Sequence, residues 1–143
     1  MEGSFTIDII AVILSTLALL FSIAQFSRDS LRQQKESTLN AYNALQYDAF
    51  EKLNKYVDMS TIEYQSDAWE EITICLAQIE NFSVGINTGI YSLKILNRLG
   101  GAFFIRQFEK LTPVIKLKRE KNVSPGSHYN EFEKTVEMLR KRS

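Results

Sequence analysis

The chain has 143 residues, and its 17 Lys and Arg residues balance 17 Asp and Glu residues, so its formal net charge is zero. A neutral chain gives no global argument for nucleic-acid binding, which is typical of basic domains. The single cysteine, Cys75, excludes a disulfide within one chain and lies in the apolar run ITICLAQI, where we expect a buried, inert thiol.

Residues 9–26, IIAVILSTLALLFSIAQF, form a run without a charge, a glycine or a proline. An α-helix rises about 1.5 Å per residue, so this run and its apolar flanks are long enough to cross a hydrocarbon core of about 30 Å. A cleaved signal peptide would begin with cations and end at a small-residue cleavage site, and neither is present. The sequence therefore predicts a retained transmembrane anchor over residues 1–27. A buried soluble helix is the alternative.

Cations follow the apolar run, and none precedes it: Arg28, Arg32 and Lys35 come directly afterwards. Cationic flanks stay in the cytoplasm, so we expect a single-pass protein with its N-terminus outside and residues 28–143 inside. These remaining residues, about 115, are enough for one domain. A second span around Glu80 and Asn87 is rejected, because one carboxylate at mid-depth alone costs a few kcal/mol.

Glycine and proline are absent between Gly3 and Gly85, so nothing in this stretch breaks a helix. After the anchor, apolar residues recur at steps of three and four, which is typical of a one-sided helix. We predict one long helix over residues 6–57 that leaves the membrane without a break. The cytosolic half of this helix needs partners, because the anchor cannot bury its apolar stripe.

Further helices complete an all-α fold, with the anchor continuing into a long cytosolic helix and a bundle of four or five helices. Asp67 and Glu70 resemble a capping box that opens the next helix. Two helices follow, one over 68–84 and one from Ser92, with a turn at 85–89 between them and a kink or a close helix contact at Gly100 and Gly101. The remaining expected elements are a short basic helix opened by Pro113, a loop at 123–127, and a last helix over 129–142 that buries Phe132, Val136 and Leu139.

Small and polar residues recur every seven positions in the anchor. We call these residues the stripe: Asp8, Ser15, Ser22 and Asp29, and beside them Ala11, Ala18 and Gln25. Small residues let helices approach closely in lipid, and polar residues in a span usually face a bundle interior or water. The stripe therefore predicts helix association into a homo-oligomer, with a water-lined pore as the narrower form. The alternative is a tolerated anchor surface whose hydroxyls bond back to their own helix.

The charges after the anchor are unevenly distributed. Residues 58–92 contain six acids and no cation, and residues 94–121 contain eight cations and two acids. Two solvated faces are one interpretation. A second is an acidic surface of one subunit against a basic surface of the next, and a third is a basic segment that contacts anionic lipid headgroups.

Motifs for catalysis are nearly absent, with no glycine-rich phosphate loop, metal-ligand cluster or nucleophile motif. RNases of the all-helical HEPN type use an Arg, four to six intervening residues and a His. The only histidine here, His128, follows Arg119 after eight intervening residues. We interpret this as a degenerate HEPN-like pair and expect no enzyme activity, no cofactor, no metal and no direct nucleic-acid binding.

The single span, the helical bundle and the Arg119/His128 pair resemble the small HEPN-like membrane accessory proteins of type VI-B CRISPR systems, which target RNA. Tyr129, Phe132 and Glu133 also resemble a segment of a wider, uncharacterised group of bacterial single-span helical proteins. The first resemblance implies an oligomeric, pore-like effector in the bacterial inner membrane. It would depolarise the cell in antiphage defence, when an RNA-guided nuclease detects phage. The alternative is a membrane-tethered interaction module that recruits a cytosolic partner and passes nothing across the bilayer.

Overall fold

The computed structural model describes the backbone of residues 2–121 and 128–142, and the side chains of residues 7–121 and 128–142. All regular elements in these ranges are helical, as the sequence predicts. The chain divides into two compact units, Met1–Gln34 and Lys35–Ser143.

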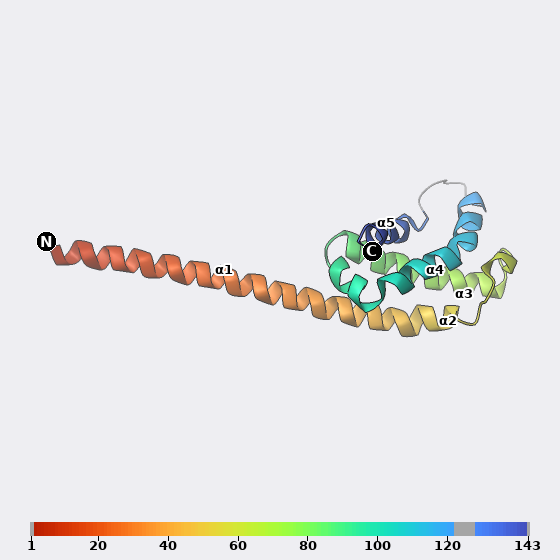
Figure 1. Ribbon diagram of the computed structural model, residues 1–143, viewed down its shortest axis with the longest axis horizontal. Coiled ribbons are helices and arrows are strands. Elements are labelled where there is room, and N and C mark those ends of the chain that lie inside the picture. Colours follow the sequence, from red (N-terminus) through yellow and green to blue (C-terminus); the bar gives the residue numbers. More distant parts are fainter. Residues whose placement is uncertain (1, 122–127, 143) are drawn as a thin grey trace. The chain divides into compact units, whose positions relative to one another are not determined.

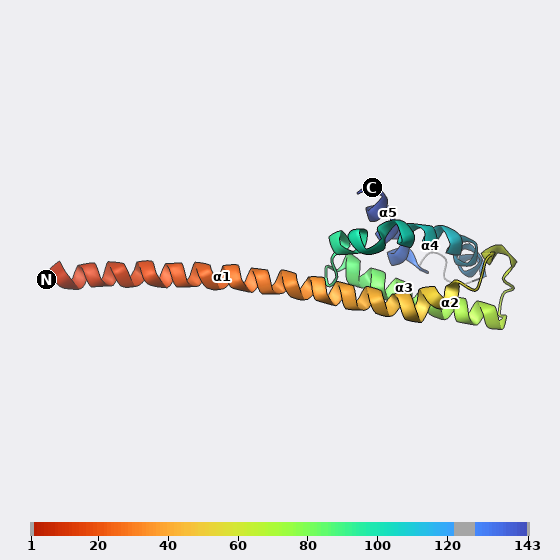
Figure 2. The same ribbon diagram turned by 60° about the horizontal axis from the view of Figure 1, so that its bottom comes forward.

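The first helix, α1 (Glu2–Leu45), continues through a π-helical turn, η1 (Gln46–Phe50), into α2 (Glu51–Leu53) (Figures 1 and 2). The prediction of one long helix that continues past the apolar run without a break is therefore confirmed, although the helix ends at Leu53 and not at residue 57. The π-helical turn was not predicted. A π turn inserts one residue into the α-helical repeat, and the sequence pattern of apolar residues does not show where.

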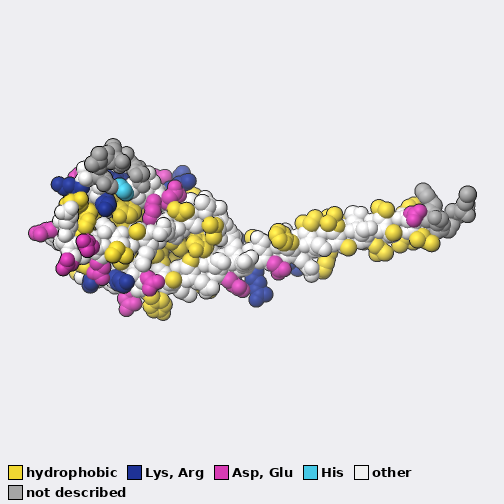
Figure 3. Space-filling model, turned by 180° about the vertical axis from the view of Figure 1, so that it is seen from behind, with side chains coloured by type: hydrophobic (Ala, Val, Ile, Leu, Met, Phe, Trp, Pro, Cys, Tyr) yellow, Lys and Arg dark blue, Asp and Glu magenta, His cyan; other side chains and the backbone are white. Residues whose placement is uncertain are grey.

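The described part of the first unit is a helix whose side chains are exposed. This holds for every side chain from Ile7 to Gln33, and Figure 3 shows hydrophobic and uncharged side chains along most of this helix. One described helix, Ile7–Leu53, is long and apolar enough to cross a membrane, with a mean hydropathy of 2.5 in its best window, none of which is buried. A core helix of a soluble domain would be covered by its own chain, and this segment is not.

The second unit packs η1 and α2 against α3 (Asp67–Asn87), and packs both α3 and α4 (Leu93–Lys121) against α5 (Asn130–Arg140). A short 3-10 turn, η2 (Met59–Thr61), precedes α3. Most of the apolar residues predicted to line one face of the long helix after the apolar run are buried, since Leu45, Ala49 and Leu53 are at most 5% exposed. Leu31, which lies before the second unit begins, is 67% exposed. The bundle thus supplies the partners that this helix requires.

The start and the end of α3 differ from the prediction. Asp67 is not the N-cap; Ser66 is, because its Oγ accepts a hydrogen bond from the backbone N–H of Trp69 at 3.2 Å. The helix also runs through Gly85, where the sequence predicted a turn. A Cβ at Gly85 would lie 2.4 Å from the ring of Tyr91, so glycine here provides space for a side chain and does not end the helix.

In α4, the predicted kink is confirmed and the predicted role of Pro113 is wrong. Gly100 leaves helical geometry with φ 177° and ψ 37°. Pro113 opens no separate helix but lies inside α4, on an exposed position. The carbonyl that loses its helical partner there can be reached by water, which reduces the cost of the proline. The loop expected at 123–127 lies outside the described residues.

The last helix, α5, lies against α3 and α4 (Figures 1 and 2). The three residues predicted to be buried are at most 1% exposed: Phe132, Val136 and Leu139. The ring of Phe132 meets those of Phe104 and Phe108 edge-on, each at 5.0 Å between centroids. Full burial of each such side chain stabilises the fold by roughly 2 kcal/mol.

The expected burial of the single cysteine is confirmed. Cys75 lies on the inner face of α3 and is 1% exposed. Burial raises the pKa of its thiol, so the nucleophilic thiolate is disfavoured at neutral pH. Cys75 is therefore a core residue and not a candidate nucleophile.

Candidate functional site

Arg119 and His128, the degenerate HEPN-like pair, meet through the histidine backbone. Arg119 lies in the last turn of α4, and its Nε donates to the backbone carbonyl of His128 at 3.0 Å. Its Nη2 donates to Asn130 Oδ1 at 3.3 Å and to the Glu133 carboxylate at 2.7 Å. The guanidinium thus bridges the end of α4 to the start of α5. In an HEPN RNase the Arg side chain is expected to work with the His imidazole, but these three hydrogen bonds go to other groups.

The start of α5 is capped from another helix. Tyr129 precedes it in the left-handed region, with φ 64° and ψ 31°, and its side chain forms no capping hydrogen bond. The Glu80 carboxylate of α3 supplies the cap instead, because it accepts from the backbone N–H groups of Glu131 at 3.0 Å and Phe132 at 2.8 Å. A carboxylate at a helix N-terminus also interacts favourably with the helix dipole.

Asn87 extends this polar contact between α3 and α5. Its Nδ2 donates to the backbone carbonyl of Glu131 at 3.0 Å and to the Glu131 carboxylate at 2.6 Å, and Thr135 Oγ1 donates to its Oδ1 at 3.2 Å. From the sequence, we used Glu80 and Asn87 as arguments against a second membrane span and predicted no structural role for them. Their structural role was missed, because the sequence contains no local signal for a cap that comes from 51 residues away.

A hollow of about 450 Å³ lies beside this junction. Its lining includes Glu80, Lys118, His128 and Tyr129. Glu80 is engaged by two backbone N–H groups, and burial, followed by the charge of Glu80, raises the pKa of the Tyr129 phenol. The raised pKa makes the Tyr129 phenol a poor proton donor at neutral pH. Among the described residues, no group of three or more His, Cys, Asp and Glu side chains could hold a metal.

Several side chains of the acidic and basic segments have partners within the chain. Glu71 pairs with Lys55 and Tyr56, and Lys110 donates from Nζ to the backbone carbonyl of Leu53 at 2.9 Å. At the end of α4, Lys118 and Lys121 lie over the rings of Trp69 and Tyr64, at 5.9 and 5.8 Å from the centroids. The cations at this end of α4 therefore have partners in the acidic segment.

The stripe forms one face of α1, and the hydroxyl donors on it are used inside the helix. Ser15 Oγ donates to the backbone carbonyl of Ala11, and Ser22 Oγ donates to that of Ala18 at 2.8 Å. Seven residues fall about 20° short of two turns of an ideal helix, so a seven-residue repeat drifts slowly around it and suits a left-handed supercoil with a partner helix. The face can offer small side chains and hydroxyl acceptor oxygens to such a partner.

Residues 9–139 match a protein family, DUF4760, which is described as a domain of unknown function. The match includes the apolar part of α1 as well as α3, α4 and most of α5. Comparison with curated proteins and comparison with solved structures gave no significant match.

Proposed function

The chain belongs to the DUF4760 family, and we propose that it is a membrane effector whose first helix anchors and self-assembles in the bacterial inner membrane, with its bundle in the cytoplasm. One observation carries the proposal: the side chains of Ile7 to Gln33 are all exposed although most are apolar. Hydrocarbon solvates such a surface, and a helix satisfies its own backbone polar groups there.

Self-assembly is the step that the stripe supports. Lipid tails are as apolar as leucine, so spans associate through close packing and interhelical hydrogen bonds and not through a hydrophobic force. Ala11, Ser15, Ala18 and Ser22 provide a narrow strip of small side chains along which two backbones can approach. Large side chains such as Leu14, Leu17 and Phe21 cover other faces.

Membrane depolarisation in CRISPR-associated antiphage defence is the finer form of the proposal. It is supported by the likeness in layout to the type VI-B accessory proteins: one span, a long helix out of it, an all-helical, HEPN-like bundle and a degenerate Arg119/His128 pair. The guanidinium bonded to a backbone carbonyl fits a non-catalytic pair. A neighbouring gene for an RNA-guided effector would add support from outside the chain.

A membrane-tethered interaction module is the second candidate function. The Ser15 and Ser22 hydroxyls donate to carbonyls of their own helix, so these two donors are not directed at a water column. In this form of the proposal, the span fixes the bundle at the membrane and the bundle recruits a cytosolic partner.

Leucine substitutions on the stripe test assembly and permeability together. Ser15→Leu and Ser22→Leu place bulky groups where helices would pack, and we expect each to weaken association about tenfold or more, equivalent to about 1.4 kcal/mol. The matched controls, Leu17→Ile and Leu20→Ile, change the other faces and keep the volume. Oligomer size in detergent and a membrane-potential dye in expressing cells are the two measurements.

The outcomes separate the two candidate functions. Loss of both oligomer and depolarisation in the stripe variants alone supports the effector. Stripe variants that assemble and depolarise like the wild type refute the stripe as an interface. A wild type that never depolarises cells, even beside its genomic partner, favours the tether.

A further inference from the structure

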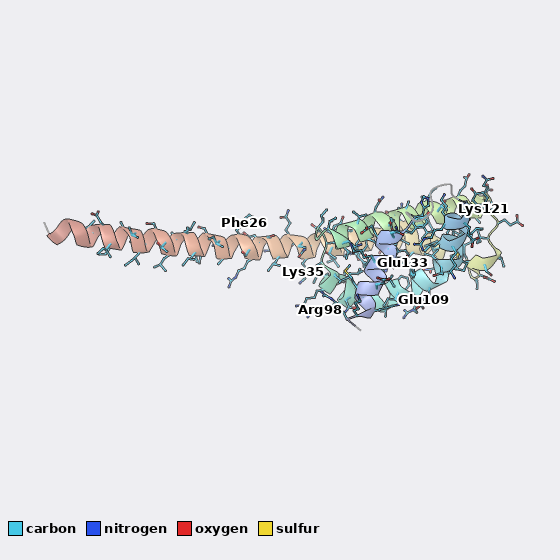
Figure 4. All side chains as sticks on the ribbon, turned by 90° about the horizontal axis from the view of Figure 1, so that it is seen from above. Phe26, Lys35, Arg98, Glu109, Lys121 and Glu133 are labelled. Carbon is cyan, nitrogen blue, oxygen red and sulfur yellow. The ribbon has the colours of Figure 1, made fainter. Side chains whose placement is uncertain are left out.

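The start of α4 lies beside the point where α1 joins the bundle. The backbone N–H of Ser92 donates to Thr38 Oγ1 at 2.8 Å, which ties together residues 54 positions apart. Lys94 and Arg98 follow in the first turns of α4, and both are exposed. In Figure 4, Arg98 lies at the same end of the bundle as Lys35, and Lys121 lies at the opposite end.

The C-terminal cations lie near the same place. A Cβ at Gly101 would come within 3.3 Å of Leu139 Cδ2, so the last turn of α5 packs against α4 just after its kink. Lys141 and Arg142 follow and are exposed. Figures 1 and 2 both show the C-terminus toward the end of the bundle that α1 joins.

We call Lys94, Arg98, Lys141 and Arg142 the basic end. Within the described residues, none of these four cations forms an ion pair, whereas Arg119 and Arg140 do. Glu137, one turn before Lys141, offsets one of the four charges. The basic end therefore differs from the far end of α4, where the cations have aromatic partners.

An exposed apolar side chain accompanies these cations. Ile90 lies in the turn between α3 and α4, two residues before Ser92, and is 62% exposed. A single exposed isoleucine is ordinary on a protein surface. Beside cations at a membrane surface, an exposed isoleucine can add to binding, because apolar side chains enter the headgroup region while cations attract anionic lipids.

The chain itself tethers the basic end close to the membrane. The apolar run ends at Phe26, and Thr38 follows only twelve residues later, a length of about 18 Å for helical residues. The headgroup region accounts for roughly 5–7 Å of this distance. Long Lys and Arg side chains and a Debye length of about 8 Å at physiological salt cover most of the remainder.

We propose that the basic end binds the anionic phospholipid headgroups of the leaflet beside it and holds the bundle against the membrane. The inference rests on the anchor in the proposed function. Lipid fits the surface better than RNA does, because the anchor keeps lipid at high effective concentration and the exposed apolar residue here is Ile90, not an aromatic ring on which a base could stack.

Energy transfer in lipid nanodiscs tests the proposal on the full chain. In a Cys75→Ser background, a donor dye is placed at Thr88→Cys, beside the basic end, or at Val57→Cys, which is 91% exposed and follows α2. The acceptor is a dye on the lipid headgroups. The discs contain either phosphatidylcholine alone or one phosphatidylglycerol in three lipids. We expect phosphatidylglycerol to raise energy transfer from position 88 and to leave position 57 nearly unchanged.

Charge variants locate the interaction. Each cation near an anionic surface contributes a factor of about five to binding, so Lys94→Gln with Arg98→Gln should shift the balance between docked and free bundle by about 25-fold and strongly reduce the response to phosphatidylglycerol. The matched control, Lys116→Gln with Lys121→Gln, removes the same charge near the other end of α4 and should keep the response. High salt should weaken it in the wild type.

Three results would overturn the proposal. The first is energy transfer from position 88 that is the same with and without phosphatidylglycerol, or a response to phosphatidylglycerol that is undiminished in the Lys94→Gln, Arg98→Gln variant. The second is a short single-stranded RNA that binds the wild type but not the variant and releases the bundle from anionic discs, which would assign the surface to nucleic acid. The third is a chain that does not float with the discs, and this result alone also refutes the anchor of the proposed function.

Discussion

The kink at Gly100 is the place where a single methyl group should be least tolerated. The φ of 177° is extended and open to any residue, so space and not backbone strain is the constraint. A Cβ at position 100 would lie 2.1 Å from Tyr42 Oη. Tyr42 is 5% exposed, its ring packs against Phe82 at 6.3 Å, and its hydroxyl accepts from Gln46 Nε2 at 2.7 Å, so it has little freedom to move.

Gly100→Ala should therefore destabilise the bundle. Overpacking of this kind costs about 1–3 kcal/mol, and a displaced hydroxyl loses a hydrogen bond worth about 1 kcal/mol. The lower backbone entropy of unfolded alanine offsets at most about 1 kcal/mol. A net loss of about 1–3 kcal/mol in a domain of this size lowers the melting temperature by roughly 5–15 °C.

The fluorescence of Trp69 measures this change, because the only tryptophan is 4% exposed and lies in the bundle. Tyr42→Phe removes Oη and leaves Cζ as the nearest atom at 3.1 Å, which a small shift can relieve. The loss in free energy of unfolding in the Gly100→Ala, Tyr42→Phe double variant should thus be smaller than the sum of the two single losses by about 1 kcal/mol or more. A Gly100→Ala protein that melts like the wild type, or a phenylalanine that gives no rescue, would refute the reasoning.

Two further predictions concern the charged groups. Hydrogen bonds from Lys55 and then Tyr56 lower the pKa of Glu71, so its contribution to stability is complete above the unfolded pKa of about 4.3 and is lost as the pH falls through the lower folded pKa. The melting temperatures of wild type and Glu71→Gln should therefore differ near neutral pH and converge below about pH 4; a constant difference would contradict the assignment. Purified protein should not cleave single-stranded RNA, and cleavage that His128→Ala abolishes would show that the pair is catalytic after all.

The features predicted correctly are those whose signal is local in the sequence. Apolar residues at steps of three and four place Phe132, Val136 and Leu139 on one face of α5, and all three are buried. The unbroken path from the anchor into the bundle follows from the absence of glycine and proline. Such patterns depend on neighbouring residues alone, so the sequence contains all the information needed.

The features missed depend on residues that are distant along the chain. In the sequence, Gly85 indicates a turn. In the structure it lies within α3, and the Tyr91 ring occupies the space where a side chain at position 85 would lie. Glu80 caps α5 from another helix, and Pro113 is tolerated because it is exposed. In the candidate site, the sequence singled out Arg119 and His128. It could not show that the guanidinium contacts a backbone carbonyl, because that depends on the left-handed turn before α5.

The hydrogen bonds within the stripe also limit what could hold two copies of α1 together in the proposed assembly. A hydroxyl that donates to the carbonyl four residues earlier keeps an acceptor oxygen but no donor for a neighbour. In the apolar run, Gln25 is the stripe residue whose amide N–H groups can donate across to another helix. The proposed assembly would then rest mainly on the close approach that Ala11, Ala18 and the two serines allow. This is why the test uses leucine, which removes space, rather than alanine, which would remove only the hydroxyl and leave the surface small.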